Sequence, residues 1–232
     1  MTETISIIIP TYQHASTIVG CIESVLGQTR KADEIIVIDD GSHDGTKELL
    51  KPYLDRIDYH YQDNKGEQTA RMNGFKKSKG SLFVLCDADL VMRPDMLERL
   101  EKALAEHPEA SWAYSSFRWG WKRFKSKAFD VDALKKMNYI HTSAMIRREH
   151  FPGMDLSVKR FQDWDLWLTM AEEGRSGIFV DEELFRTVHD NNRLAISGWI
   201  PSFMFKLPWK SSAVKRYEQA RKIIYAKHKI TL

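Results

Sequence analysis

The stretch of residues 80–90 constrains the fold most, because it is apolar until it reaches two carboxylates, Asp87 and Asp89. An apolar run of this length is typical of a strand that is buried on both faces of a sheet. The end of such a strand delivers acidic side chains to a cleft. Mg2+ and Mn2+ prefer carboxylate and phosphate oxygens as ligands. The stretch therefore predicts a buried strand that ends at a site for a metal ion and a diphosphate.

Two earlier stretches, residues 5–10 and 34–40, are also apolar and β-branched, and the second again ends in two acids, Asp39 and Asp40. The segments between the strands have helical periodicity, and a shorter, more polar run suits an edge strand. The expected helices cover residues 18–26, 46–54, 66–80 and 94–104, and the edge strand covers residues 59–63. This alternation predicts an α/β fold with a mostly parallel, Rossmann-like sheet flanked by helices. Ligands bind such sheets beyond the carboxyl ends of the strands, where the acids would meet.

The second half of the chain is less regular, which favours a smaller mixed part that shapes an acceptor site. We expect strands at residues 112–117, 139–147, 178–180 and 184–188, a basic aromatic loop at 119–127 and a helix at 163–173. The predicted division is a nucleotide-sugar-binding half at 1–107, an acceptor-binding half at 108–198 and an aromatic, basic tail at 199–232.

Composition narrows the classes of protein. A chain of 232 residues with 43% hydrophobic content can bury a substantial core, and a formal charge of +3 is too small to indicate nucleic acid as a partner. Cys21 and Cys86 lie in apolar segments and match no metal-ligand spacing, which indicates reduced core cysteines of a cytosolic protein. The sequence begins without a signal-peptide pattern and has no apolar run long enough to span a bilayer. We therefore expect a soluble, cytoplasmic protein.

Five motifs follow one another in the order seen in family 2 glycosyltransferases, which this chain resembles over roughly residues 5–190. They are residues 6–12, 34–46, 64–66 with Ala70-Arg71, 87–89 and 162–167. The resemblance implies a GT-A fold and transfer of a sugar from a nucleotide diphosphate donor with inversion at the anomeric carbon. It also implies a divalent metal cofactor, Mn2+ or Mg2+.

On the nucleotide side, the resemblance implies that Pro10, Thr11 and Tyr12 line the nucleotide pocket. Asp40, with Asp39 behind it, would accept a hydrogen bond from the base. Uracil and thymine present the same imide N–H, so both UDP and dTDP donors stay open. The alternative for the two acids is capping of the turn at residues 41–45.

On the diphosphate side, Arg71 would face the nucleotide or diphosphate, unless it is an ordinary surface arginine. The family's Ala-Arg-Asn pattern is altered here, because Met72 separates Arg71 from Asn73. The resemblance makes Asp89 the metal ligand and Asp87 a contact to ribose or donor sugar. The Asp-x-Asp pattern also occurs in the nucleophile motif of haloacid dehalogenases. Leu90 and the late position of the strand disfavour that alternative.

Asp163 occupies the position of the family's catalytic base, with Gln162 in place of the usual Glu. It would take the proton from the acceptor hydroxyl. Asp165, two positions further, would point elsewhere on a helix. Capping of the helix start by either Asp is the alternative role.

Three further residues have open roles. His189 lies in a segment that resembles the family's Arg-x-x-His and would complete the metal shell or contact a phosphate, unless it is a solvated loop histidine. Arg186 is a candidate for diphosphate neutralisation. His141 has either a packing role at a strand start or a role in the acceptor site.

The tail combines an aromatic segment with a basic one. This pattern suits contact with an anionic membrane surface that would bring the site to a lipid-linked or other saccharide acceptor at the inner face. The alternatives are a helix that packs Val214, Tyr217 and Ile224 on the body, or a contact in a homo-oligomer.

The predicted function is inverting glycosyl transfer in surface polysaccharide or glycolipid assembly. One rival is a sugar nucleotidyltransferase, although residues 10–14 do not form the Gly-rich loop of that class. The other rival is a catalytically silent nucleotide-sugar-binding module.

Overall fold

Apolar strands and amphipathic helices alternate along the computed structural model, which describes residues 3–188, 209 and 211–231. The strands are β1 Ile5–Thr11, β2 Glu34–Asp39, β3 Asp58–Tyr61, β4 Leu82–Leu85, β5 Leu90–Met92, β6 Trp112–Trp119, β7 Lys122–Phe124, β8 Met145–Arg147 and β9 Gly177–Thr187. The helices are α1 Ile18–Leu26, α2 Thr46–Leu50, α3 Glu67–Lys77, α4 Met96–Glu106, α5 Val131–Lys136, α6 Gln162–Glu172 and α7 Ser212–Lys227. Short 3-10 helices cover Lys51–Tyr53 and Arg148–His150.

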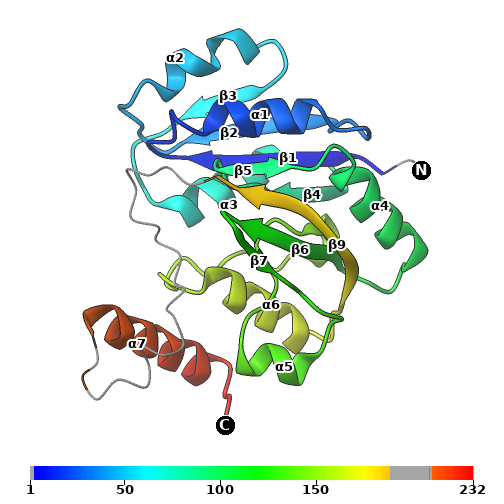
Figure 1. The fold of residues 1–232 in the computed structure, drawn as a ribbon, viewed down its shortest axis with the longest axis vertical. Coiled ribbons are helices and arrows are strands. Elements are labelled where there is room, and N and C mark those ends of the chain that lie inside the picture. The colour runs from blue at the N-terminus through cyan, green and yellow to red at the C-terminus, as the bar shows by residue number, and fades with distance from the viewer. Residues whose placement is uncertain (1–2, 189–208, 210, 232) are drawn as a thin grey trace.

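One nine-stranded sheet runs through the molecule in the order β3-β2-β1-β4-β8-β6-β9-β5, with β7 paired to β6 (Figure 1). The strands β3, β2, β1 and β4 are parallel, as the alternation of strands and helices predicts. The strand β8 pairs antiparallel with both β4 and β6, so β6 again runs in the direction of β1. The α/β fold with a curled, mostly parallel sheet confirms the predicted fold class, and the edge position of β3 confirms the predicted edge strand.

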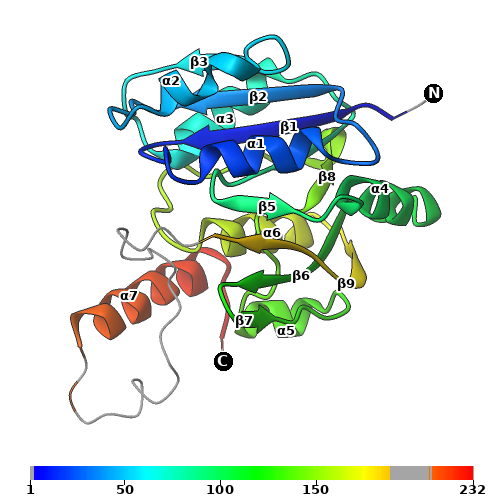
Figure 2. The ribbon, with the colours of Figure 1, turned by 45° about the horizontal axis from the view of Figure 1, so that its top comes forward.

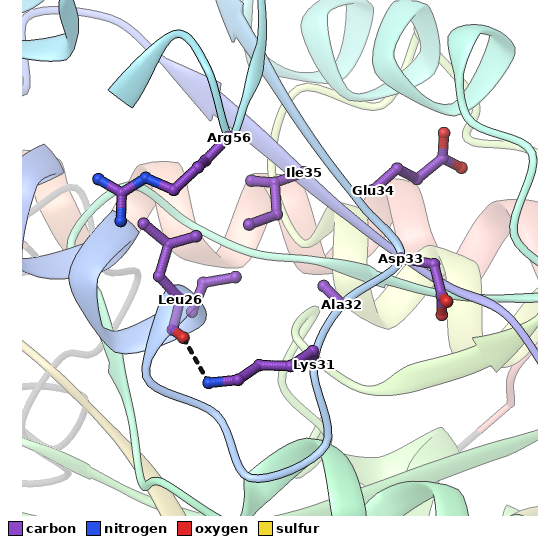
Figure 3. Close-up of a pocket in the computed structure, with 8 residues that line it drawn as sticks. Leu26, Lys31, Ala32, Asp33, Glu34, Ile35 and Arg56 are labelled. Atoms are coloured by element: carbon purple, nitrogen blue, oxygen red, sulfur yellow. Dashed lines mark hydrogen bonds between the residues drawn. The ribbon is translucent and has the colours of Figure 1, made fainter. Parts of the chain in front are cut away.

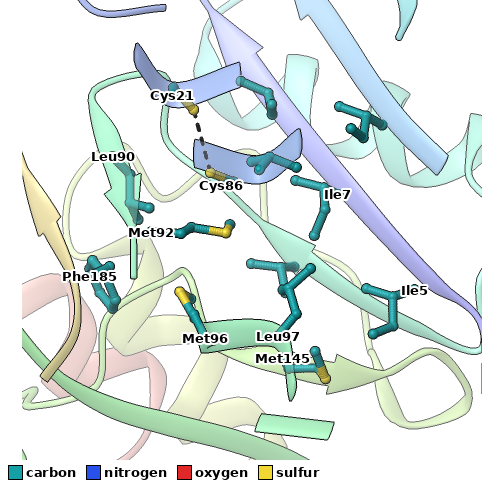
Figure 4. Packing of buried hydrophobic residues seen from close by; sticks show 14 of the residues in the cluster. Ile5, Ile7, Cys21, Cys86, Leu90, Met92, Met96, Leu97, Met145 and Phe185 are labelled. Atoms are coloured by element: carbon teal, nitrogen blue, oxygen red, sulfur yellow. Dashed lines mark hydrogen bonds between the residues drawn. The ribbon is translucent and has the colours of Figure 1, made fainter. Parts of the chain in front are cut away.

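The central strands bury both faces, and their residues alternate between two hydrophobic clusters. Ile5, Ile7 and Ile9 of β1 join α1 and α4 in one cluster, part of which Figure 4 shows. Ile8 joins the other cluster on the opposite face, together with α5, α6 and Ile224 of α7. Gly74 lets α3 approach β1, because a Cβ there would lie 2.4 Å from Ile8 Cγ2. Burial on both faces explains why these strands read as continuous apolar runs.

Cys21 and Cys86 lie in the first cluster as free, fully buried thiols with their Sγ atoms 3.7 Å apart (Figure 4). This placement confirms the prediction of core cysteines.

The sheet curls back on itself, which explains the position of the two acids after β4. The last strand in the sheet order, β5, follows directly in sequence after β4, which is fourth in that order. The Met92 N–H of β5 donates to Ser24 Oγ of α1 at 3.0 Å. The connection 86–89 therefore crosses from the centre of the sheet to its curled end, and Asp87 and Asp89 lie on this crossing.

In the second half, the structure differs from three local predictions. Residues 122–124 form β7 and pair with β6 as a hairpin, where a loop was expected. Only Met145–Arg147 of the expected strand 139–147 is extended, and residues 177–187 form one strand instead of two. The single strand β9 crosses register shifts opposite Ser115, Ser116 and Phe117, and these irregularities obscure its alternation in the sequence.

The helix α7 lies beside α6, at the end of the molecule far from β3 (Figures 1 and 2). Val214 and Ile224 are fully buried, and the ring of Tyr217 lies 4.9 Å from that of Phe161. The alternative in which this helix packs on the body is therefore correct for α7. Residues 199–208, 210 and 232 of the predicted tail lie outside the described residues. Within the described part of the chain, none of the helices has the length and apolar character needed to cross a membrane.

Candidate active site

The carboxyl end of β2 holds two buried acids whose oxygens organise the neighbouring loops. Asp39 accepts from Ser42 N–H at 2.8 Å and from the Tyr59 hydroxyl at 2.7 Å. Asp40 accepts from the Gln62 side chain at 2.7 Å. The two acids thus fix the turn after β2. Asp39 caps this turn, which is the alternative role that the sequence left open for Asp39 and Asp40.

Asp40 also receives the backbone N–H groups of the loop that precedes α3. Lys65 N–H donates to Oδ1 and Gly66 N–H to Oδ2, both at 2.8 Å. Gly41 permits this contact, because its φ of +88° favours glycine and a Cβ there would lie 3.0 Å from Asn64 N. The loop around residues 62–66 is thereby held at the carboxyl edge of the sheet.

The loops that follow β1 and β2 pack together at the same edge, beside the residues predicted to line the nucleotide pocket. Gln13 N–H donates to Ser42 Oγ at 2.9 Å, and Ala15 N–H donates to Asp44 Oδ2 at 2.8 Å. Pro10 and Thr11 are buried at the end of β1, whereas the Tyr12 side chain is exposed. The pair of loops forms a wall beside the strand ends.

Arg71 is a buried cation that ties α3 to the connection after β4. Its Nη2 donates to Glu67 Oε1 and to Asp87 Oδ1, each at 2.6 Å, and the residue is only 3% exposed. Burial alone would lower the pKa of Arg71, but Glu67 and Asp87 raise it above its ordinary value. Burial likewise works against Asp87, yet Arg71 and His141 lower the pKa of its carboxyl. Arg71 is therefore a charged partner of Asp87 and not an ordinary surface arginine.

Asp163 sits in the first turn of α6, which is entered through Phe161 in the left-handed region at φ 59°. Its Oδ1 accepts from Trp164 N–H at 2.8 Å and its Oδ2 from the Asn138 side chain at 2.7 Å. Burial raises the pKa of Asp163, and His141, the Trp164 N–H and Arg71 oppose this rise only in part. A carboxylate with a raised pKa is a better proton acceptor, which suits a general base.

The charges of Arg71, Asp87, His141 and Asp163 act on one another, so the structure brings these four residues into one group. The predicted residues Arg71, Asp87 and Asp163 come from three separate motifs of the sequence. The charge of the expected base, Asp163, therefore acts on the expected donor contact Arg71.

Asp165 points away from this group, as its spacing predicts. Its Oδ1 contacts His228 Nε2 at 2.9 Å, and its Oδ2 accepts from Lys227 Nζ at 2.9 Å. The second acid of the motif therefore fastens the end of α7 to α6. It caps neither helix.

Some buried polar atoms at this edge have no hydrogen-bond partner within the described residues. They include Thr11 Oγ1 at the end of β1, Arg71 Nε, Ser143 Oγ and Thr187 Oγ1 at the end of β9. Buried polar atoms without a partner are costly, so such a group suits a polar ligand.

Asp89 lies where β5 begins, and its carbonyl oxygen accepts from Val188 N–H at 2.8 Å. His189, the other predicted metal residue, lies outside the described residues. The described residues contain no cluster of three or more acidic, histidine or cysteine side chains arranged for a metal. Mg2+ in nucleotide sites typically uses one or two carboxylates and completes its shell with phosphate oxygens and water. The carboxylates after β4 fit that chemistry.

A surface hollow lined by Leu26, Lys31 and Arg56 lies at the start of β2, near Glu34 (Figure 3). It is at the opposite end of that strand from Asp39 and Asp40. This hollow is therefore separate from the candidate active site.

Sequence reasoning missed two contacts of the site. Glu67 and Arg71 are four residues apart in α3, a spacing that indicates a helical ion pair and would have revealed Glu67. Asn138 donates to Asp163 from a loop 25 positions away, and no local sequence pattern predicts this contact.

The comparisons with known proteins agree with this geometry. The model of glycosyl transferase family 2 matches residues 6–153. The chain belongs to that family.

Several relatives resemble this family 2 glycosyltransferase. The putative teichuronic acid biosynthesis glycosyltransferase TuaG of Bacillus subtilis is 26% identical over 212 residues, which cover 84% of this chain and 82% of TuaG. The glycosyltransferase GlyG of Streptococcus pneumoniae is 33% identical over 110 residues, which cover 46% of this chain. The matched region spans only 36% of the length of GlyG.

Two solved structures share the GT-A fold. TarS of S. aureus, residues 1–349 in complex with UDP-GlcNAc, has a TM-score of 0.69 at 14% identity and covers 97% of this chain and 72% of that one. Mannosyltransferase PcManGT from Pyrobaculum calidifontis, in complex with GDP-Man and Mn2+, has a TM-score of 0.66 at 17% identity and covers 98% of this chain and 71% of that one. These two likenesses show that this chain has the same fold as the two solved structures.

Proposed function

We propose that this protein is an inverting, metal-dependent glycosyltransferase that moves a sugar from a UDP- or dTDP-sugar to an acceptor hydroxyl. The observation that carries the proposal is the convergence of Arg71 and Asp87 with Asp163 in one group of interacting charges. The first two residues suit the donor, and the third is a carboxylate whose pKa is raised by burial.

The proposed chemistry is a single displacement. The acceptor oxygen forms a bond to the anomeric carbon while the bond from that carbon to the diphosphate oxygen breaks, and its electron pair leaves with the nucleoside diphosphate. Asp163 takes the hydroxyl proton, and Asn138 with the Trp164 N–H holds its carboxylate in place. Attack from the face opposite the diphosphate inverts the configuration.

The leaving diphosphate carries the charge that the site has to balance. The charge of Arg71 is already offset by Glu67 and Asp87, but its Nε–H, which has no partner among the described residues, is left to donate to a diphosphate oxygen. A bound Mn2+ or Mg2+, held by Asp89 with His189 as a second ligand, would neutralise part of the developing charge. The complex of PcManGT with Mn2+ supports the use of such an ion in this fold.

In this proposal, Asp40 favours a donor whose base is a pyrimidine. Asp40 is already held by Gln62, Lys65 and Gly66, and each carboxylate oxygen has two lone pairs, so one acceptor position can meet the imide N–H of the base. Pro10, Thr11 and Tyr12 would line the same pocket. The UDP-GlcNAc complex of TarS supports UDP as the first nucleotide to test.

The proposed acceptor is a saccharide or lipid-linked saccharide in surface polysaccharide or glycolipid assembly at the cytoplasmic face of the membrane. The name of TuaG, which refers to teichuronic acid biosynthesis, supports this class of acceptor. The exposed side chains of Lys215, Arg216 and Lys222 on α7 offer positive charge for an anionic surface. Co-sedimentation with anionic against neutral vesicles tests the membrane contact, and size-exclusion chromatography with light scattering tests a homo-oligomer.

The central experiment compares slow hydrolysis of a panel of nucleotide sugars by the wild type, Asp89→Ala and Asp163→Asn, with and without Mn2+. We expect turnover of one donor by the wild type, and a loss of about 100-fold or more in Asp163→Asn. Asp132→Asn on α5 is the control, because it changes an acid whose side chain is 83% exposed. Undiminished turnover in both site variants would reject the assigned roles.

The same experiment separates the rival functions. UDP and Mn2+ that raise the melting temperature without any donor turnover would indicate a silent binding module. Release of pyrophosphate from a nucleoside triphosphate and a sugar phosphate would indicate a nucleotidyltransferase.

A further inference from the structure

The loop that joins α5 to β8 brings a histidine into the group of charges without a role in the chemistry described so far. The ring of His141 lies against two phenylalanines, with centroids 4.8 Å from Phe117 of β6 and 5.0 Å from Phe185 of β9. These two phenylalanines stack on each other at 5.1 Å with an interplanar angle of 1°. The aromatic packing leaves the imidazole plane little freedom to rotate.

A backbone contact fixes which ring nitrogen carries hydrogen. Ser143 N–H donates to His141 Nδ1 at 3.1 Å, so Nδ1 is the acceptor and the hydrogen of the neutral ring is on Nε2. Burial lowers the pKa of His141, and Asp87 and Asp163 oppose this only in part. The imidazole therefore offers a single N–H, at a defined position.

Two acids of the proposed site, Asp87 and Asp163, act on this ring by their charge. His141 Nε2 lies 3.8 Å from Asp87 Oδ2, which is too long for a hydrogen bond. Asp163 is the other acid whose charge acts on the ring. Among the described residues, no acceptor lies within hydrogen-bond distance of Nε2. The N–H is therefore left without a protein acceptor beside Asp87, the residue proposed to contact the donor sugar.

We propose that His141 donates a hydrogen bond from Nε2–H to a hydroxyl group of the transferred sugar, and so helps to select and orient that sugar. This role rests on the proposed glycosyl transfer, and it adds a residue that recognises the transferred sugar. A neutral N–H suits a sugar hydroxyl, because the hydroxyl oxygen accepts a hydrogen bond without bringing another charge beside Asp87 and Asp163.

Two variants separate this role from a packing role, because each keeps one half of the imidazole's hydrogen bonding. In His141→Gln the amide N–H2 lies near the position of Nε2, so the donor to the sugar is kept and the acceptor for Ser143 is lost. In His141→Asn the amide oxygen lies near the position of Nδ1, so the acceptor is kept and the donor is lost. The two side chains differ little in polarity.

The experiment measures kcat and KM for the donor sugar that the wild type hydrolyses, together with the affinity for UDP and the melting temperature. We expect His141→Asn to lose about tenfold in kcat/KM relative to His141→Gln, the loss expected for one buried hydrogen bond, with UDP affinity unchanged in both. A donor analogue that lacks the contacted hydroxyl should reduce turnover by the wild type and leave His141→Asn unaffected.

Equal rates in the two variants, a faster His141→Asn, or loss of turnover in both would overturn the assignment. A structural role through Ser143 predicts the faster His141→Asn. The result is distinct from a failure of the proposed function, since that failure would appear as absence of turnover in the wild type itself.

Discussion

At the scale of single residues, the sequence identified acids at strand ends and at a helix start, but it did not identify what holds them. Asp163 was found by its motif, whereas Asn138, which orients it, is bonded only through the folded loop. Arg71 was left open between surface and site, and the structure buries it against Asp87. Local patterns report which side chains a strand or helix presents. They do not report partners that come from another part of the chain.

The pH dependence of transfer should follow Asp163. The base acts in its ionised form, and burial raises its pKa above the ordinary value of 3.8, so kcat/KM should fall as pH drops through that raised pKa. The pKa of His141 is lowered below 6.5, so His141 stays neutral above that pH. Its titration therefore does not change the rate above pH 6.5. Rates measured from about pH 4.5 to 8, with UDP binding measured in the same buffers, test this expectation. An acid limb that persists unchanged in Asp163→Asn would contradict it.

Asp40 should serve both the loop around residues 62–66 and the nucleotide. In Asp40→Asn, one oxygen becomes an amide that cannot accept from Lys65 or Gly66 N–H. We expect the melting temperature to fall and UDP affinity to drop by about tenfold, the cost of roughly one to two buried hydrogen bonds. Isothermal titration with UDP measures the effect. Asp55→Asn, which changes an acid whose side chain is 75% exposed, is the control, and equal affinities in the two variants would remove Asp40 from the nucleotide site.

At the scale of elements, the sequence predicted the strands that are buried on both faces. It did not predict the short strand β7 in the second half of the chain. The runs in β1, β2 and β4 are apolar because helices cover both faces of them. The strand β7 is a three-residue edge piece rich in basic residues, and it is extended only because β6 pairs with it. Its composition alone indicated a loop, and pairing with a distant strand overrode that preference.

The link between α6 and α7 should depend on Asp165. Its carboxylate holds both Lys227 and His228 in a site where the Asp165 side chain is 5% exposed, so Asp165→Asn removes two charge-assisted contacts. We expect the free energy of unfolding to fall by about 2–3 kcal/mol and the melting temperature by roughly 5–10 °C. Calorimetry measures this change, with Asp132→Asn on α5, an acid whose side chain is 83% exposed, as the control. Equal stability of the two variants would mean that α7 is held by its apolar face alone.

The same link should weaken at alkaline pH. Burial alone would lower the pKa of His228, but its hydrogen bonds to Asp165 and Glu172 raise the pKa above the ordinary value of 6.5. The stabilising contribution is therefore fully present below 6.5 and is lost as pH rises through the raised pKa of the folded state. The difference in melting temperature between the wild type and His228→Gln should shrink from about pH 6 to pH 9. A difference that grows over this range would contradict the assignment.

At the scale of the whole molecule, the predicted halves share one sheet. The strand β4 of the first half pairs with β8 of the second, and β8 pairs with β6. The proposed base on α6 and the proposed donor contacts on α3 and on the connection after β4 are therefore fixed relative to each other through hydrogen-bonded strands and through Arg71. The family motifs predicted the donor contacts and the base separately. Only the folded sheet shows that the pairing of β4, β8 and β6 joins the two halves that carry them.

This continuity predicts that binding in the first half stabilises the second. All seven tryptophans lie at position 112 or later, so tryptophan fluorescence reports the surroundings of residues from the second half. Trp112, Trp164 and Trp167 are buried in the cluster that also contains Ile8 of β1. UDP with Mn2+ at about 100 times its dissociation constant should stabilise the fold by about 2.7 kcal/mol. Because the sheet couples the halves, urea midpoints from tryptophan fluorescence and from far-ultraviolet circular dichroism should coincide and rise together. A nucleotide that moves the dichroism midpoint and leaves the fluorescence midpoint in place would show that the halves unfold independently.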